Sequence, residues 1–114
     1  EADIVTLHCP KLPETIDLID TDAFARMKPG AILVNSARGG IVNEAACAEA
    51  LKSGQLGGAA LDTLDVEPID ETAQAVFRGV PNLILTPHVA GVTQESNRRI
   101  AEVAAANVRR VLGE

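Results

Sequence analysis

Four short apolar runs recur along the chain, and the segments between them carry helix-like patterns. The runs predict strands at Ile4–Leu7, Ala31–Asn35, Gly57–Leu61 and Leu83–Leu85. The second run, which begins Ala31-Ile32-Leu33-Val34, is continuously apolar and predicts a strand that is buried on both faces. Strands that alternate with helices are joined by right-handed crossovers and build a parallel sheet. The fold class predicted is therefore α/β, with a parallel sheet and flanking helices.

The predicted helices are placed by their caps and by apolar spacing. A helical turn is expected within 14–19, a short helix from a Thr21 or Asp22 cap through Met27, and a weak helix over 72–78. Asn43 caps a helix over 44–53, and Thr93 caps the longest one. The buried face of the helix over 44–53 is predicted at Ala46, Ala50 and Leu51, and that of the longest helix at Ile100, Val103, Ala104, Val108, Val111 and Leu112.

Composition narrows the classes of partner. The 114 residues suit one domain, and with only two aromatic residues its core is mainly aliphatic. A net charge of −6 argues against nucleic acid or an anionic membrane as partner. No apolar run approaches the roughly 18 residues of a membrane span. Cys9 and Cys47 are far apart, so no disulfide framework and no zinc or other metal site is expected, and reduced thiols in a cytoplasmic protein are predicted.

Polar residues follow each predicted strand, namely His8, Arg38, Asp62 and His88. Their separations of 30, 24 and 26 residues suit one strand–helix–strand unit each. All carboxyl ends of a parallel sheet lie along one edge, where ligands bind, so one cleft is expected there. Arg38 is suited to gripping a carboxylate through two hydrogen bonds, although a surface ion pair is the alternative. His8 and Asp62 alone also fit a strand cap and a turn cap.

The chemistry that fits these side chains is the oxidation of a 2-hydroxy acid, or its reverse. A base must take the hydroxyl proton as hydride leaves the same carbon, and His88 suits that task near neutral pH. Glu67 is placed to bond the other ring nitrogen and fix the tautomer. Arg38 would hold the substrate carboxylate and polarise the keto oxygen. Taken alone, His88 also fits an ordinary loop residue, and Asp65, Asp70 and Glu71 fit solvated acids.

At these residues the sequence resembles the D-isomer-specific 2-hydroxyacid dehydrogenases, the family that includes phosphoglycerate dehydrogenase. The matching segments run along nearly the whole chain: Leu7-His8-Cys9-Pro10, Pro13-Glu14-Thr15, Met27-Lys28-Pro29-Gly30-Ala31, Val34-Asn35-Ser36-Ala37-Arg38-Gly39-Gly40, Gly58-Ala59-Ala60-Leu61-Asp62, Glu67-Pro68 and Leu85-Thr86-Pro87-His88. The resemblance implies that Arg38, Glu67 and His88 are catalytic, that Arg38 and His88 contact the substrate, and that Asp62 meets the nicotinamide carboxamide. It also implies that Cys9, Pro10, Ser36 and Ala37 line the cofactor cleft, with Ala90 and Gly91 near the nicotinamide end.

The sequence departs from the family pattern in two places. Thr63 and Leu64 stand where the family often has valine and an aromatic residue, which affects loop packing more than chemistry. No G-x-G-x-x-G motif with a following ribose-binding acid is present. Residues 1–114 are therefore expected to be the second half of a Rossmann-like NAD-binding domain, without the glycine-rich loop and most of the substrate domain. The expected cofactor is NAD, with NADP as the alternative, and the resemblance implies that the longer protein containing this chain is a homodimer. The alternative function is a non-enzymatic, NAD-sensing corepressor-like module of the same fold.

Overall fold

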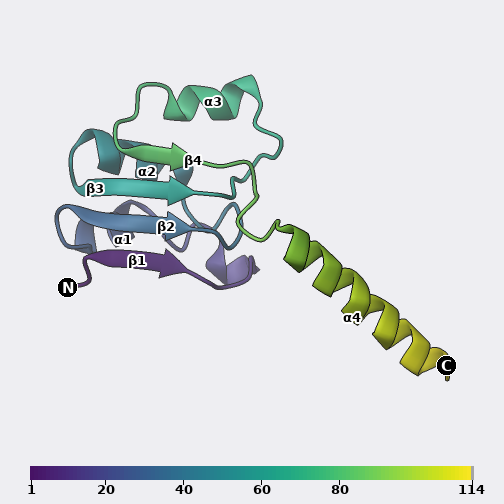
Figure 1. Cartoon of the computed structure of the whole chain (residues 1–114). Coiled ribbons are helices and arrows are strands. Elements are labelled where there is room, and N and C mark those ends of the chain that lie inside the picture. The colour runs from purple at the N-terminus through teal and green to yellow at the C-terminus, as the bar shows by residue number, and fades with distance from the viewer. Residues whose placement is uncertain (114) are drawn as a thin grey trace.

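The predicted strands form one parallel sheet in a computed structural model that describes residues 1–113 (Figure 1). Its strands lie in the order in which they occur along the chain: β1 (Ile4–Leu7), β2 (Ala31–Asn35), β3 (Leu56–Leu61) and β4 (Leu83–Leu85). The predicted bounds of β1, β2 and β4 are confirmed, and β3 begins one residue earlier than predicted. Leu7 pairs with Asn35, Asn35 with Leu61 and Leu61 with Leu85. The strands therefore end level with one another, and the loops that follow them emerge at one edge.

Four α-helices and a 3-10 turn are present in the described residues: η1 (Pro13–Thr15), α1 (Thr21–Arg26), α2 (Glu44–Lys52), α3 (Glu71–Phe77) and α4 (Gln94–Leu112). The predicted caps of α2 and α4 are confirmed, because Asn43 Oδ1 accepts from Ala46 N and Thr93 Oγ1 accepts from Ser96 N. The cap of α1 is Asp20, rather than Thr21 or Asp22, since the extended Asp20 backbone lets its carboxylate reach Ala23 N–H at 2.9 Å. Asp70 caps α3 in the same way and so is not merely a solvated acid.

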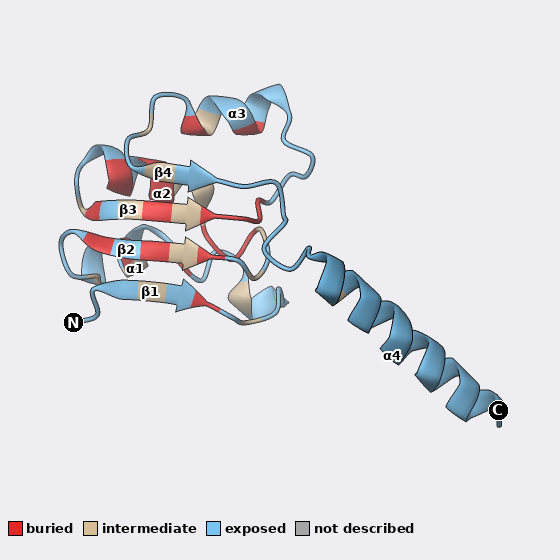
Figure 2. Ribbon diagram, in the orientation of Figure 1, coloured by how far each residue is buried: buried red, intermediate tan, exposed pale blue. Residues whose placement is uncertain are grey.

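The core lies on one side of the sheet, against α1 and α2 (Figure 2). Leu33 and Ile41 are fully buried, and Leu51, Leu61 and Phe24 are nearly so. The prediction that the second strand is buried on both faces is wrong, because Ile32 is 42% exposed. Successive side chains of a strand point to opposite faces. Ile4 and Ile84 are also exposed, so the face they share with Ile32 has no helix packed on it within the described residues.

Helix α4 leaves the edge of the sheet and extends away from it (Figure 1). The predicted buried stripe of this helix is wrong, since none of its residues is buried and Val111 is 78% exposed. The helical spacing gives α4 an apolar side, but nothing in residues 1–113 packs on it. The extension shows in the radius of gyration, which is 17.3 Å against about 13 Å for a compact chain of this length. Within the described part of the chain, no helix combines the length and apolar character that a membrane span needs.

Candidate functional site

The turn that carries Arg38 is fixed by the last residue of β2. The Asn35 side chain is buried, where its Oδ1 accepts from Ala37 N at 3.1 Å and its Nδ2 donates to Arg38 O at 2.9 Å. These two bonds tie the turn to the strand end and leave the Arg38 side chain exposed. Arg38 Nη1 donates to Ala37 O at 2.7 Å. Among residues 1–113 no carboxylate lies within ion-pair distance of Arg38, so the guanidinium keeps donors for a ligand.

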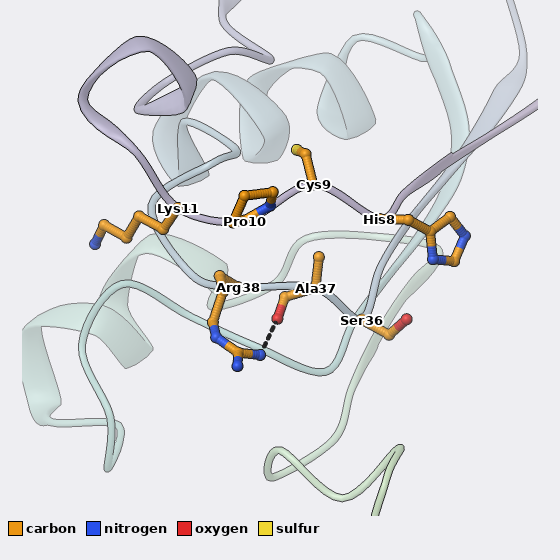
Figure 3. Close-up of a pocket in the computed structure, with 7 residues that line it drawn as sticks. All are labelled: His8, Cys9, Pro10, Lys11, Ser36, Ala37 and Arg38. Atoms are coloured by element: carbon orange, nitrogen blue, oxygen red, sulfur yellow. Dashed lines mark hydrogen bonds between the residues drawn. The ribbon is translucent and has the colours of Figure 1, made fainter.

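A cleft of about 570 Å³ opens between the loops that follow β1 and β2 (Figure 3). Its lining contains every residue predicted for the cofactor cleft on these two loops, together with His8 and Lys11: His8, Cys9, Pro10, Lys11, Ser36, Ala37 and Arg38. His8 lies at one end of this row and Lys11 at the other. His8 Nε2 is 3.0 Å from Thr6 Oγ1, so the ring is held at the end of its own strand. The structure therefore gathers these residues around an open space.

A second hollow, of about 340 Å³, lies between the loops that follow β3 and β4. Its lining includes Asp62, Glu67, Thr86 and His88. The prediction of a shared sheet edge is confirmed, but the described chain forms two neighbouring hollows instead of one cleft. Between the two hollows, the backbones of the loops after β2 and β3 lie in close contact. A Cβ on Gly39 would lie only 1.8 Å from Leu64 O. Within residues 1–113 no cluster of three or more potential metal ligands is present.

The second hollow contains a histidine–carboxylate pair, as the sequence predicted. Glu67 Oε2 lies 2.7 Å from His88 Nδ1, and Glu67 Oε1 accepts from Leu64 N at 2.8 Å. The hydrogen bond from His88, followed by that from Leu64, lowers the pKa of Glu67 below its usual value. An ionised acceptor at Nδ1 favours the tautomer that carries its proton there. His88 Nε2 is then the basic atom and can take a proton from a ligand hydroxyl.

Asp62 anchors the segment that carries His88. This carboxylate is buried, and it accepts from Thr86 Oγ1 at 2.5 Å, from Val89 N at 2.9 Å and from Ala90 N at 2.9 Å. Burial alone would raise its pKa, but the three hydrogen bonds outweigh that effect and hold the pKa below its usual value. Asp62 O also accepts from His88 N at 2.8 Å. The turn-cap interpretation of Asp62 is therefore correct as geometry.

The anchored segment holds His88 in the left-handed region, with φ 56°. Few residues other than glycine adopt this conformation without surrounding structure that enforces it. The predicted residues Ala90 and Gly91 follow on this segment. Ala90 is held through its N–H, and both residues are exposed outside the linings of the two hollows.

Several residues shape the site through contacts that no sequence signal predicted. Thr86 was matched only as part of a motif, yet its hydroxyl binds Asp62. Lys11 lies 2.7 Å from Asp65, which is therefore ion-paired and not simply solvated. Thr63 and Leu64, where the sequence departs from the family pattern, are both buried, and Thr63 Oγ1 has no hydrogen-bond partner in the described part of the chain. These contacts join residues far apart in sequence, which no spacing rule identifies.

Comparison with known proteins identifies relatives of this chain. Residues 1–90 match the family model for the NAD-binding domain of D-isomer specific 2-hydroxyacid dehydrogenases. The (S)-sulfolactate dehydrogenase of Chromohalobacter salexigens is 54% identical over 99% of this chain and 36% of its own length. A D-3-phosphoglycerate dehydrogenase of Synechocystis is 45% identical over 98% of this chain and 20% of its own.

Solved structures of other proteins also resemble this chain. The D-lactate dehydrogenase of Lactobacillus jensenii with NAD+ superposes with a TM-score of 0.87 at 37% identity, covering 100% of this chain and 38% of that one. The chain thus spans little more than a third, or less, of the proteins that it matches.

Proposed function

Because the chain belongs to the D-isomer-specific 2-hydroxyacid dehydrogenase family, we propose that it is part of an oxidoreductase acting on a small 2-hydroxy acid or 2-keto acid. The observation that carries this proposal is the 2.7 Å contact between Glu67 and His88 at the strand edge that also bears Arg38. The pair supplies a general base whose partner fixes its tautomer.

In the oxidation direction, His88 Nε2 takes the proton of the substrate hydroxyl as the hydride leaves carbon 2. In the reduction direction the same atom returns the proton to the keto oxygen. Glu67 remains a carboxylate throughout, because its lowered pKa favours the ionised form, and it stabilises the charged ring. Burial of the pair on substrate binding would strengthen this attraction, since charges interact more strongly away from water.

Arg38 is proposed to clamp the substrate carboxylate. Its guanidinium carries five N–H donors in a planar fork, and the structure uses Nη1 for Ala37 O. The remaining donors can hold a carboxylate through two bonds and support the oxygen on carbon 2 as charge develops there. A substrate held in this way would need to reach from Arg38 to the neighbouring hollow, where the oxygen on carbon 2 would meet His88 Nε2.

NAD is the cofactor that the family implies, and the residues present fit it. The cleft after β1 and β2 lies at the carboxyl edge of a parallel sheet, where dinucleotides bind, and Cys9, Pro10, Ser36 and Ala37 line it. Asp62 would meet the nicotinamide carboxamide, with Ala90 and Gly91 nearby. The bound nicotinamide would accept or supply the hydride. Use of NADP instead would be decided by residues outside those that line this cleft.

Residues 1–114 are proposed to form the second half of the cofactor domain, and the whole enzyme to be a homodimer. The chain has no G-x-G-x-x-G segment for the pyrophosphate. By itself it is therefore expected to bind NADH weakly and to have no turnover. Calorimetry that detects micromolar binding of NADH to the 114-residue chain would contradict this expectation. Relatives named for sulfolactate and phosphoglycerate suggest a 2-hydroxy acid that bears a second anionic group.

The test uses the full-length protein that contains this sequence, with the absorbance of NADH as the readout. His88→Ala should lower kcat by at least about 100-fold, the usual effect of a lost acid–base group. Glu67→Gln should lower it less, and Glu49→Gln is the matched control because the Glu49 side chain is exposed and bonds Lys52, away from both hollows. Wild-type turnover in His88→Ala would refute the assignment. Absence of turnover with all 2-keto acids would favour a non-enzymatic, NAD-sensing role.

A further inference from the structure

One peptide unit in the loop after β3 is held from both sides. It is the unit that joins Leu64 to Asp65, and its carbonyl oxygen packs against Gly39, where even a methyl group would collide. Its N–H donates to Glu44 Oε1 at 2.7 Å, from the first turn of α2. The Leu64 side chain is buried in the core. The backbone of the loop is therefore fixed in position at this point, although residues 65–70 are exposed.

The peptide unit just before the fixed one, which joins Thr63 to Leu64, leads directly to the proposed acid–base pair. Leu64 N–H donates to Glu67 Oε1, and Glu67 Oε2 contacts His88 Nδ1. Three contacts thus run in series from Glu44 to the loop backbone, from the loop backbone to Glu67, and from Glu67 to His88. A carboxylate that is tied at one oxygen presents the other in a defined direction.

We propose that Glu44 is a positioning residue, which holds the loop after β3 so that Glu67 stays on His88. This inference deepens the proposed function, because it concerns the residue that orients the proposed base. Glu44 touches neither hollow and is not a catalytic residue. Its effect depends on the length of its side chain, which extends from α2 to the backbone N–H of Asp65.

The charges around Glu44 make its place costly unless it has such a role. Burial is the main cause that raises the pKa of Glu44 above its usual value. The hydrogen bond from Asp65 N–H lowers this pKa, and the neighbouring charges of Asp65 and Glu67 raise it. Lys11, which is bonded to Asp65 at 2.7 Å, partly offsets them. Cys47, one turn along α2, is a further titratable group close enough for the charge of Glu44 to raise its pKa.

The competing explanation is that Glu44 serves only α2. An acidic residue in the first turn interacts favourably with the helix dipole, and this accounts for its charge. It does not account for the direction of Oε1, which is bonded to a loop 21 residues further along the chain. The two explanations make opposite predictions for variants that separate charge from length.

Glu44→Asp keeps the charge but is one methylene shorter, and Glu44→Gln keeps the length and an acceptor oxygen but loses the charge. The readout is the ring nitrogen spectrum of His88 in the 15N-labelled 114-residue chain, at a pH where the neutral ring dominates. The chain has only two histidines, so His8 is an internal reference. Wild type and Glu44→Gln should show the His88 proton fixed on Nδ1. Glu44→Asp should lose that signature and show averaging between the two tautomers.

Glu49→Gln is the matched control on the same helix and should match wild type, since the exposed Glu49 carboxylate accepts from Lys52 and has no side-chain bond to the loop after β3 within residues 1–113. Retention of the fixed tautomer in Glu44→Asp, or its loss in Glu44→Gln, would overturn the proposal in favour of the helix-dipole explanation. Circular dichroism checks that each variant is folded. Glu44→Asp is chosen because it keeps the negative charge that stabilises the first turn of α2. If wild type itself lacked the Nδ1–H form, the Glu67–His88 pair and the proposed function would fail instead, so the two failures are distinguishable.

Discussion

Replacement of the buried Asp62 by alanine should strongly destabilise the chain. Asp62 is 8% exposed. Its carboxylate accepts three hydrogen bonds, from the Thr86 hydroxyl and from the backbone N–H groups of Val89 and Ala90. The variant removes the acceptor and leaves these donors to find water or remain without partners. It also frees the segment that holds His88 in its left-handed conformation.

The magnitude follows from the number and surroundings of these bonds. A hydrogen bond to a charged group contributes about 1.5–3 kcal/mol to stability. Val89 and Ala90 are exposed, so in the variant their N–H groups can bond to water. The hydrogen bonds from these two residues should therefore each contribute an amount at or below the lower end of that range. We therefore expect Asp62→Ala to lower the free energy of unfolding by about 3–5 kcal/mol. Asp62→Asn keeps one acceptor oxygen and should lose about 1–2 kcal/mol.

Urea unfolding of the 114-residue chain, followed by circular dichroism, measures this loss. Asp3→Ala is the control, because Asp3 is an acid whose side chain is 79% exposed and whose partner is Lys28. An exposed pair of this kind should contribute less than about 1 kcal/mol. If Asp62→Ala cost no more than Asp3→Ala, the three hydrogen bonds would not be what holds the segment after β4.

The same variant has a pH dependence whose sign is fixed by the lowered pKa of Asp62. A carboxylate with a depressed native pKa stabilises the fold above its unfolded pKa, which is about 3.9 for aspartate, and this stabilisation is lost as the pH falls through the native pKa. The difference between wild type and Asp62→Ala should therefore be constant from about pH 5 to 7 and shrink below about pH 4. A difference that stays constant into acid would contradict this reasoning.

Three further expectations concern the packing of the chain. Gly39→Ala should lower the free energy of unfolding by more than about 2 kcal/mol in urea, because its Cβ would lie 1.8 Å from Leu64 O and the backbones must separate; a loss within about 0.5 kcal/mol would contradict the close approach. In the native chain a thiol reagent should label Cys9 but not Cys47. Cys47 is fully buried, and burial raises the pKa of its thiol to about 11. Labelling of both cysteines before denaturant is added would contradict this expectation. Backbone amides of α4 should exchange with solvent faster than those of β2, since none of its residues is buried, and equal protection by mass spectrometry would show that the helix packs on something.

Much of the fold was predictable because the signals that specify it are local. The bounds of β2 follow from an apolar run that ends at a polar residue, and the start of α2 follows from Asn43, whose side chain bonds an amide three residues ahead. Interactions over this distance depend little on the rest of the chain. The same holds for the placement of Arg38 and His88 after parallel strands, since alternation of strands and helices permits one sheet edge for both.

The sequence by itself therefore determined the order of the elements, the common edge of the sheet and the identity of the side chains placed there. Only the tertiary structure decided which apolar surfaces are covered, because the stripe on α4 and the face around Ile32 have the pattern of buried surfaces but no partner in the described residues. It also decided that Asp62 anchors the segment after β4 and that Glu44 reaches the loop that carries Glu67. Such contacts join residues more than 20 positions apart, and their geometry depends on the path of each loop, which no periodicity in the sequence encodes.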